Sequence, residues 1–268
     1  MQRIKNIFIT LFRIINSPEL LFLPANMAFF IILSIFPILT LIGLLSTYFS
    51  VSIDSLITTL NILPSGISNL LIPFIESNTF DSNLIFSIGI AFLIASNGTH
   101  ALILATNSLY KIENSNYIKR RIKALFLIIL LIILLIFLIS FLAYGNQLFK
   151  TILEIVTFKP VNNILIYIFA FIKWPIAMII IFFIIKLVYV LSPDDKINSK
   201  TTTKGAIFTT IGFTISTAIF SFYVSNFSHY DVYYGSIANI IVLMIWVYIL
   251  SYILVIGIAI NVRAYRNN

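Results

Sequence analysis

The chain has 268 residues, of which 60% are hydrophobic and 10% are charged, and its formal net charge is +8. Soluble domains carry about 25% charged residues, so this composition excludes an ordinary water-soluble domain and requires lipid around much of the chain. The absence of cysteine excludes disulfides, thiolate metal sites and cysteine nucleophiles, and two histidines leave little for a transition-metal site.

The first sixteen residues predict an amphipathic helix that lies in the membrane interface. They interleave Arg3, Lys5 and Arg13 with Ile, Phe and Leu, the pattern of helices that bury one face among lipid head groups. A mitochondrial presequence has a similar composition, but the apolar runs that follow favour the interfacial helix.

Six apolar runs follow, and each is long enough to cross a bilayer as a helix, which takes about 20 residues. They lie at 24–49, 83–109, 124–145, 163–191, 205–226 and 234–261. The stretch 50–82 is too polar to cross, and we expect short amphipathic helices there on the outer surface. The prediction is an all-α membrane protein with one polytopic domain over 1–268.

The positive charges predict the orientation of these spans. With the N-terminus inside, the outer segments hold only Lys150 and Lys159 of the 17 Lys and Arg residues, while the inner segments hold most of the others. Cytoplasmic loops carry such an excess of positive charge. We therefore expect a multi-pass protein of the bacterial cytoplasmic (inner) membrane with both termini in the cytoplasm.

Polar side chains inside the second span are candidates for a substrate-contacting face. Asn97, His100 and Asn107 recur at helical spacing, and Gly98 permits close approach of a neighbouring backbone. Polar groups at membrane depth are costly and usually face the protein interior. Hydrogen bonding between helices and a polar lining for a substrate both explain this face.

The fourth span carries Lys173 beside Trp174 and Pro175 near its middle. Pro175 suits the first turn of a new helix, so the span is either continuous or broken at 173–175. Lys173 either snorkels to the outer interface, with Trp174 in the aromatic belt, or contacts an anionic group.

The last two spans carry small and polar side chains at helical spacing. In the fifth, Gly205, Thr209 and Gly212 belong to a stripe that predicts close helix packing. The outer turn between the spans is rich in tyrosine, asparagine and serine. The junction formed by this turn and the span residues on either side supplies four further candidates for a polar lining: Tyr223, Asn226, Tyr234 and Asn239.

Several motifs together resemble the YihY/virulence factor BrkB family of bacterial inner-membrane proteins. They are ANMAFFIILSIFP at 25–37, ASNG at 95–98 with Asn107 and Tyr110, Trp174-Pro175, and FYVSNF at 222–227 followed by YGS at 234–236. The resemblance covers nearly the whole chain. The family often has an acidic residue in a G-x-E-x-N pattern, where this chain has Ala259, and this puts any mechanism that needs that acid in doubt.

The resemblance implies a link to envelope integrity, and we expect a transporter- or flippase-like protein that handles an anionic lipid or envelope precursor. The alternative is a non-catalytic scaffold that binds lipid or partner proteins, and 119–123 (KRRIK) suits anionic head groups. The family's older label as a ribonuclease finds no support, because a nuclease needs clustered carboxylates or histidines. The pair Asp194-Asp195 is expected to cap a helix end. We expect no enzyme activity, no cofactor, no metal and no nucleic-acid partner.

Overall fold

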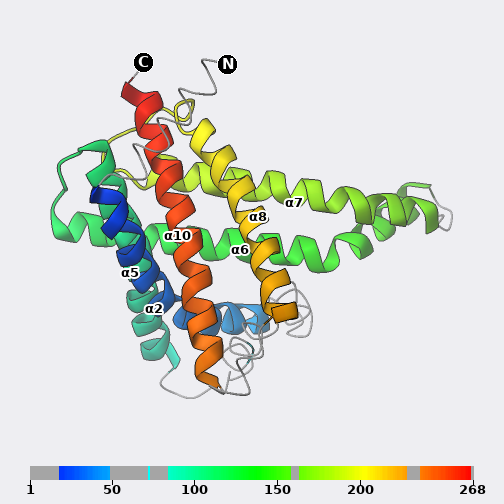
Figure 1. Ribbon diagram of the computed structural model, residues 1–268. Coiled ribbons are helices and arrows are strands. Elements are labelled where there is room, and N and C mark those ends of the chain that lie inside the picture. The colour runs from blue at the N-terminus through cyan, green and yellow to red at the C-terminus, as the bar shows by residue number, and fades with distance from the viewer. Residues whose placement is uncertain (1–17, 49–71, 73–83, 158–162, 228–235, 267–268) are drawn as a thin grey trace, which may run out of the picture.

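The structure, a computed structural model, describes residues 18–48, 72, 84–157, 163–227 and 236–266. Long α-helices dominate this part of the chain, and it contains no strand (Figure 1). In chain order they are α2 (Pro18–Tyr48), α5 (Leu84–Tyr110), α6 (Tyr117–Thr157), α7 (Asn163–Leu191), α8 (Thr203–Phe227) and α10 (Ser236–Arg266). All six are long and apolar enough to cross a membrane. The predicted all-α membrane fold with about six spans is confirmed.

Two predicted elements cannot be compared with the structure. The interfacial helix at the N-terminus lies outside the described residues. The amphipathic segment 50–82 also lies outside them, apart from Ile72.

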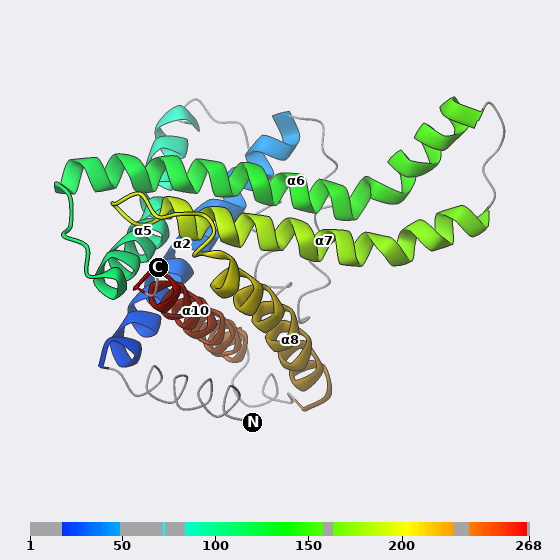
Figure 2. The ribbon, with the colours of Figure 1, turned by 90° about the horizontal axis from the view of Figure 1, so that it is seen from above.

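The helices pack as a closed ring. Each helix contacts the next in the order α2, α5, α6, α7, α8 and α10, and α10 contacts α2, which closes the ring. The antiparallel pair α6–α7 runs across the other four helices and projects beyond α8 (Figures 1 and 2). The apolar part of α5 is half buried, against about a fifth for α6 (22%) and α7 (17%). The polar second span is therefore an inner helix, while α6 and α7 present most of their apolar surface to lipid.

Two helix boundaries differ from the sequence prediction in an informative way. The third span was expected to end at 145, yet α6 continues to Thr157. The extension contacts α7 at Phe149, whose ring stacks on that of Phe169 with centroids 4.2 Å apart, so packing helps to continue a helix that hydropathy alone would end. The fourth span is continuous, with Pro175 inside α7; helices in lipid tolerate proline where neighbouring groups compensate for the lost hydrogen bond.

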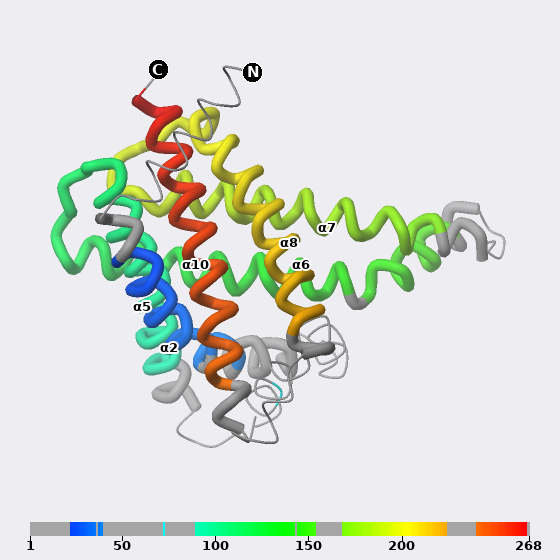
Figure 3. The backbone as a smooth tube through the Cα atoms, in the orientation of Figure 1, coloured from blue at the N-terminus to red at the C-terminus, as the bar shows by residue number. Residues whose placement is uncertain are grey.

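Glycines bring α8 and α10 into close contact, as the sequence predicted for the fifth span. A methyl group on Gly205 would overlap the carbonyl oxygen of Gly257, and one on Gly212 would press against Ile253. The side-chain oxygen of Asn261 accepts the Gly205 N–H at 2.8 Å. Figure 3 shows the start of α8 beside the last turns of α10. Small residues thus permit the backbone approach that holds the two helices together.

Candidate functional site at the start of helix α6

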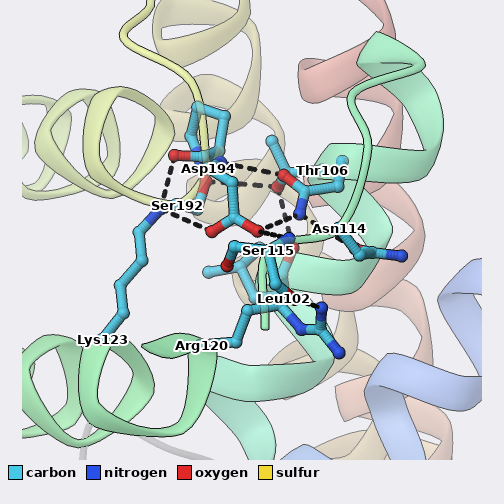
Figure 4. A network of polar contacts seen from close by, with 10 residues as sticks. Leu102, Thr106, Asn114, Ser115, Arg120, Lys123, Ser192 and Asp194 are labelled. Carbon is cyan, nitrogen blue, oxygen red and sulfur yellow. Dashed lines mark hydrogen bonds and ion pairs between the residues drawn. The ribbon is translucent and has the colours of Figure 1, made fainter. Parts of the chain in front are cut away.

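A polar cluster surrounds the carboxylate of Asp194, in the connection between α7 and α8 (Figure 4). One carboxylate oxygen accepts the Asn107 side-chain N–H at 2.8 Å and the Ser115 backbone N–H at 3.0 Å. The other oxygen faces the Lys123 ammonium at 3.2 Å. The cluster joins the end of α5, the α5–α6 connection, the start of α6 and the α7–α8 connection. We call these residues, with Asn114, the Asp194 network.

Asn107 is the centre of the Asp194 network and is fully buried (0% exposed). Its side-chain oxygen accepts the Asp194 backbone N–H at 2.9 Å, while its amide nitrogen donates to Asp194 and, at 3.0 Å, to Asn114. Both amide hydrogens and the oxygen are therefore used within the protein. Buried polar groups are normally paired in this way. Through these bonds Asn107 links α5 to the α5–α6 connection and to the α7–α8 connection.

The surroundings of Asp194 set its charge. Burial is the largest single influence and would raise its pKa, but hydrogen bonds from Ser115, Asn107 and Lys123 together outweigh it and lower the pKa from 3.8 to about 2. Hydrogen bonds to the charged form of a carboxyl favour that form. Asp194 is therefore ionised at neutral pH. The backbone N–H that it accepts is that of Ser115, which precedes α6, so this bond orders the α5–α6 connection and is not the helix cap expected of the Asp194-Asp195 pair.

A second tie joins α6 to α5 beside the network. The guanidinium of Arg121 donates to the Asn97 side-chain oxygen at 2.8 Å and to the Leu93 carbonyl at 2.6 Å. Two residues further along α5, the Thr99 hydroxyl donates to the Ala124 carbonyl oxygen at 2.8 Å. Asn97 thus serves helix packing and also holds a cation at this end of the molecule.

Two polar atoms near this tie have no hydrogen-bond partner among the described residues. They are Nε2 of His100 and Nε of Arg120, and both atoms are buried. The His100 ring meets Tyr117 edge to face, with centroids 5.9 Å apart, and Arg120 also binds the Ser115 carbonyl. Leaving a buried polar group unpaired costs about 1–3 kcal/mol. An acceptor supplied from outside the protein would recover that energy.

These atoms belong to a strongly basic part of the chain. The first turns of α6 hold Lys119, Arg120, Arg121 and Lys123, which we call the basic segment. Lys123 is paired with Asp194, and Arg121 is bound to uncharged oxygens. The basic segment therefore keeps an excess of positive charge.

The first and second spans meet at a polar contact between Ser34 and Gly98, which belong to two of the motifs that carry the family resemblance. The Ser34 hydroxyl lies 2.6 Å from the Phe30 carbonyl and accepts the Gly98 N–H at 3.0 Å, close to the Ile94 carbonyl at 3.4 Å. A side chain of α2 thus enters the hydrogen-bond ladder of α5. The absence of a side chain on Gly98 makes room, since a methyl group there would lie 3.0 Å from the Ser34 oxygen.

The predicted lining residues do not all come together. Asn97, His100 and Asn107 lie at the basic end, whereas Lys173 packs over Gly145 and donates to the Leu142 carbonyl of α6 at 3.0 Å. Tyr223 is partly exposed on α8. Tyr234 lies outside the described residues, as do the side chains of Asn226 and Asn239. The structure therefore separates Lys173 from the three residues of the second span.

Sequence reasoning missed several residues of this site. Lys123, Arg120 and Arg121 were used for orientation and, within the run 119–123, for contact with anionic head groups, but their partners inside the protein were not predicted. Asn114 and Ser115 were not considered. The available signal was a basic run at the start of one span and an acidic pair at the end of the next, because such charges meet when the two spans form an antiparallel pair. A group of three His, Asp or Glu side chains that could hold a metal does not occur within the described part of the chain.

Comparisons with known proteins agree on the kind of molecule. The family model described as "Virulence factor BrkB" matches residues 11–268. The chain is 29% identical over 247 residues to the ribonuclease-like protein YfkH of Bacillus subtilis (strain 168), covering 90% of this chain and 89% of that protein.

Shorter matches link the chain to proteins named only as membrane proteins. A UPF0761 membrane protein of Idiomarina loihiensis is 29% identical over 93 residues, covering 35% of this chain and 33% of that protein. Another, of Pseudoalteromonas atlantica, is 39% identical over 80 residues, covering 30% and 25%. No solved structure gives a significant match.

Proposed function

The chain belongs to the virulence factor BrkB family, and on that premise we propose that it binds an anionic lipid or envelope precursor at the start of α6 and handles it as a transporter- or flippase-like protein. The membrane is the bacterial inner membrane, with the basic segment and both termini on the cytoplasmic side. The ligand chemistry is a phosphate-bearing head group attached to an acyl chain.

One observation carries the proposal: buried, unpaired nitrogen atoms lie beside an excess of positive charge. Nε of Arg120 is always a donor, and Nε2 of His100 becomes one when protonated there. Phosphate oxygens accept hydrogen bonds from arginine with favourable geometry. The helix starts at Tyr117, so its free backbone N–H groups add to the attraction for an anion.

The position of the basic segment favours a lipid over a soluble anion. The basic segment lies in the first turns of α6, inside the candidate span Tyr117–Leu142, and the uninterrupted apolar stretch follows it from Ala124. A head group bound there would have its acyl chains alongside the exposed apolar residues Ile122, Phe126 and Ile129. Basic residues at the end of a membrane helix attract anionic head groups in this way.

The proposal assigns no catalysis to the chain. Both carboxylate oxygens of Asp194 are occupied by donors from Asn107, Ser115 and Lys123, so this carboxylate is not free to act as a general base. The word ribonuclease-like in the name of the Bacillus subtilis relative describes that protein. It has no counterpart among the groups that we place at this site.

A second function, as a non-catalytic scaffold, is favoured by the Asp194 network itself. Asn107 and Asp194 use their hydrogen-bonding groups to link α5, α6 and the α7–α8 connection. Such saturation suits a rigid platform for lipids or partner proteins better than a moving gate. The scaffold binds the same head group but does not move it.

The test compares Arg120→Gln with Lys119→Gln in lipid nanodiscs that contain phosphatidylglycerol. Both changes remove one positive charge from the same turn, but only the first removes the unpaired buried Nε. We expect phosphatidylglycerol that copurifies with the protein, measured by mass spectrometry, to fall several-fold in Arg120→Gln and to stay near the wild-type level in Lys119→Gln. Equal lipid content in all three proteins would overturn the proposed site.

A second measurement separates transport from scaffolding. The proteins are reconstituted in vesicles with fluorescent phosphatidylglycerol, and its exposure on the outer face is followed by chemical quenching. Movement of lipid by the wild type that is lost in Arg120→Gln supports the transporter reading. Retained binding without movement favours the scaffold. Release of bound lipid by inorganic phosphate would indicate that the site recognises phosphate alone.

A further inference from the structure

Helix α6 is too long for the membrane that it crosses. Its 41 residues span about 60 Å at 1.5 Å per residue, while the hydrocarbon core is about 30 Å thick. Even a helix tilted by about 40°, the upper end of the usual range, crosses the core in about 26 residues. A large part of α6 must therefore lie outside the core.

The excess lies at the end of α6 that is far from the basic segment. The four cations of that segment precede Ala124, so the apolar path starts there. An upright helix that starts at Ala124 leaves the core near Ala143, and a strongly tilted one leaves it near Phe149. Residues 150–157 are outside the core in either case. Lys173 gives independent evidence for where α6 leaves the core. It donates to the Leu142 carbonyl and is followed by the exposed Trp174, and lysine and tryptophan are both typical of a membrane interface.

We call residues 147–157 of α6 the overhang; it comprises 150–157 and the three residues before them, at which a strongly tilted helix would leave the core, and it is amphipathic. Leu148 and Ile152 are more than half exposed, at 57% and 58%, and they lie four residues apart on one side of the helix. Gln147 and Thr151 are also exposed and form a polar stripe next to the apolar one. The half-buried Phe149 faces α7, where it stacks on Phe169.

Exposed leucine and isoleucine side chains in water, beyond the core, would cost free energy. We propose that the overhang of α6 lies in the head-group region of the same membrane, with Leu148 and Ile152 inserted at the boundary with the acyl chains and Gln147 and Thr151 facing water. Figure 2 shows the end of α6 turning away from the line of its first part and from α7. Such a turn lets the overhang follow the membrane surface instead of standing in water.

The partner of this surface is lipid, for two reasons found in the molecule. The apolar stripe continues the lipid-facing surface of the same helix, which includes Ile133 and Phe137, without an intervening charged turn. Its pairing with an exposed polar stripe matches helices that lie in the plane of the interface. The inference uses the basic segment only to mark where the apolar path of α6 starts and does not depend on ligand binding there, so either idea can fail without the other.

The natural chain has no cysteine, so single cysteines can be labelled without background. We would label Ile152→Cys and Thr151→Cys with an environment-sensitive fluorophore in nanodiscs, and Leu148→Cys and Gln147→Cys as a second matched pair. Each label is then quenched by a lipid-borne quencher and by aqueous iodide. The expected ratio of lipid to aqueous quenching is several-fold higher at Ile152 and Leu148 than at Thr151 and Gln147.

Three outcomes would overturn the proposal. Water-like labels at all four positions would place the overhang in solution. Lipid-like labels at all four would place it inside the core. Protection of Ile152→Cys from both quenchers, together with disulfide cross-linking between two copies, would show that a second copy of the chain covers the apolar stripe.

Discussion

Replacing Asp194 with asparagine removes the charge at the centre of the Asp194 network while keeping the shape of the side chain. The new amide keeps one oxygen as an acceptor but turns an N–H group toward donors that already face it, namely Asn107, Ser115 or Lys123. The Asp194 side chain is 8% exposed and that of Lys123 is 25% exposed. The substitution therefore leaves a largely buried ammonium without its counter-charge.

The size of the effect follows from the pKa. A fall in the pKa of Asp194 from 3.8 to about 2 corresponds to about 2 kcal/mol of stabilisation of the charged form at neutral pH. Loss of one partner of a fully buried ion pair costs about 3–5 kcal/mol, and the partial exposure of Lys123 places this pair below that range. We expect Asp194→Asn to lower the free energy of unfolding by about 2 kcal/mol.

The sign of the pH dependence gives a sharper check. Because the folded-state pKa of Asp194 is depressed, its stabilisation is fully present above pH 3.8 and is lost as the pH falls toward 2. The assay is unfolding in mixed micelles with increasing sodium dodecyl sulfate, at pH 7 and at pH 5, for wild type and Asp194→Asn. The difference between the two proteins should be the same at both pH values.

Two results would refute this reasoning. A change within about 0.5 kcal/mol is ordinary for a surface substitution and would mean that the network contributes little. A difference that changes between pH 7 and pH 5 would mean that the pH dependence arises from a group other than an Asp194 with a depressed pKa. Lys123→Met, alone and combined with Asp194→Asn, isolates the energy of the pair.

Three further substitutions test other contacts by the same unfolding assay. Gly205→Ala should lower the free energy of unfolding by about 1–3 kcal/mol, because the added methyl group would overlap the backbone of α10. Its control, Gly89→Ala, adds a methyl group in open space and should be neutral or stabilise the helix by up to about 1 kcal/mol. Equal effects of the two changes would contradict close packing of α8 on α10. Ser34→Ala should cost about 1 kcal/mol or more, because the Gly98 N–H loses its nearby acceptor, and no change would mean that α5 restores its own backbone bond. Lys173→Met should fold with less than about 1.5 kcal/mol lost, since one hydrogen bond to a carbonyl is removed, and a failure to fold would show that Lys173 neutralises a buried charge.

The spans could be predicted from the sequence because lipid leaves a single structural solution for a long apolar segment. The end of α6 could not, since 146–157 are polar enough to suggest a loop and become helical by packing on α7 at Phe169. The effect of Pro175 could not be predicted either, because a proline fits both the first turn of a new helix and the interior of a continuous helix in lipid. Its surroundings, and not its own geometry, decide that α7 continues through it.

The site was predicted in part. Helical spacing correctly placed Asn97, His100 and Asn107 on one inner helix, but their partners lie in other segments. Asn107 binds Asp194, 87 positions away, and no periodicity within one helix reports such a contact. Lys173 looked like a companion of these residues because it shares their polarity, yet its partner is a carbonyl of α6.

The closed order of the helices has a consequence for the way in which the protein is made. Helix α2 is among the first segments to leave the ribosome, yet one of its two ring neighbours is α10, which ends at Arg266. Until the 31 residues of α10 are inserted, α2 and α8 both present an uncovered flank, and the Gly205 N–H lacks the Asn261 oxygen. The ring is therefore closed only when α10 is in place. In a chain cut short before α10, the ring would stay open between α2 and α8.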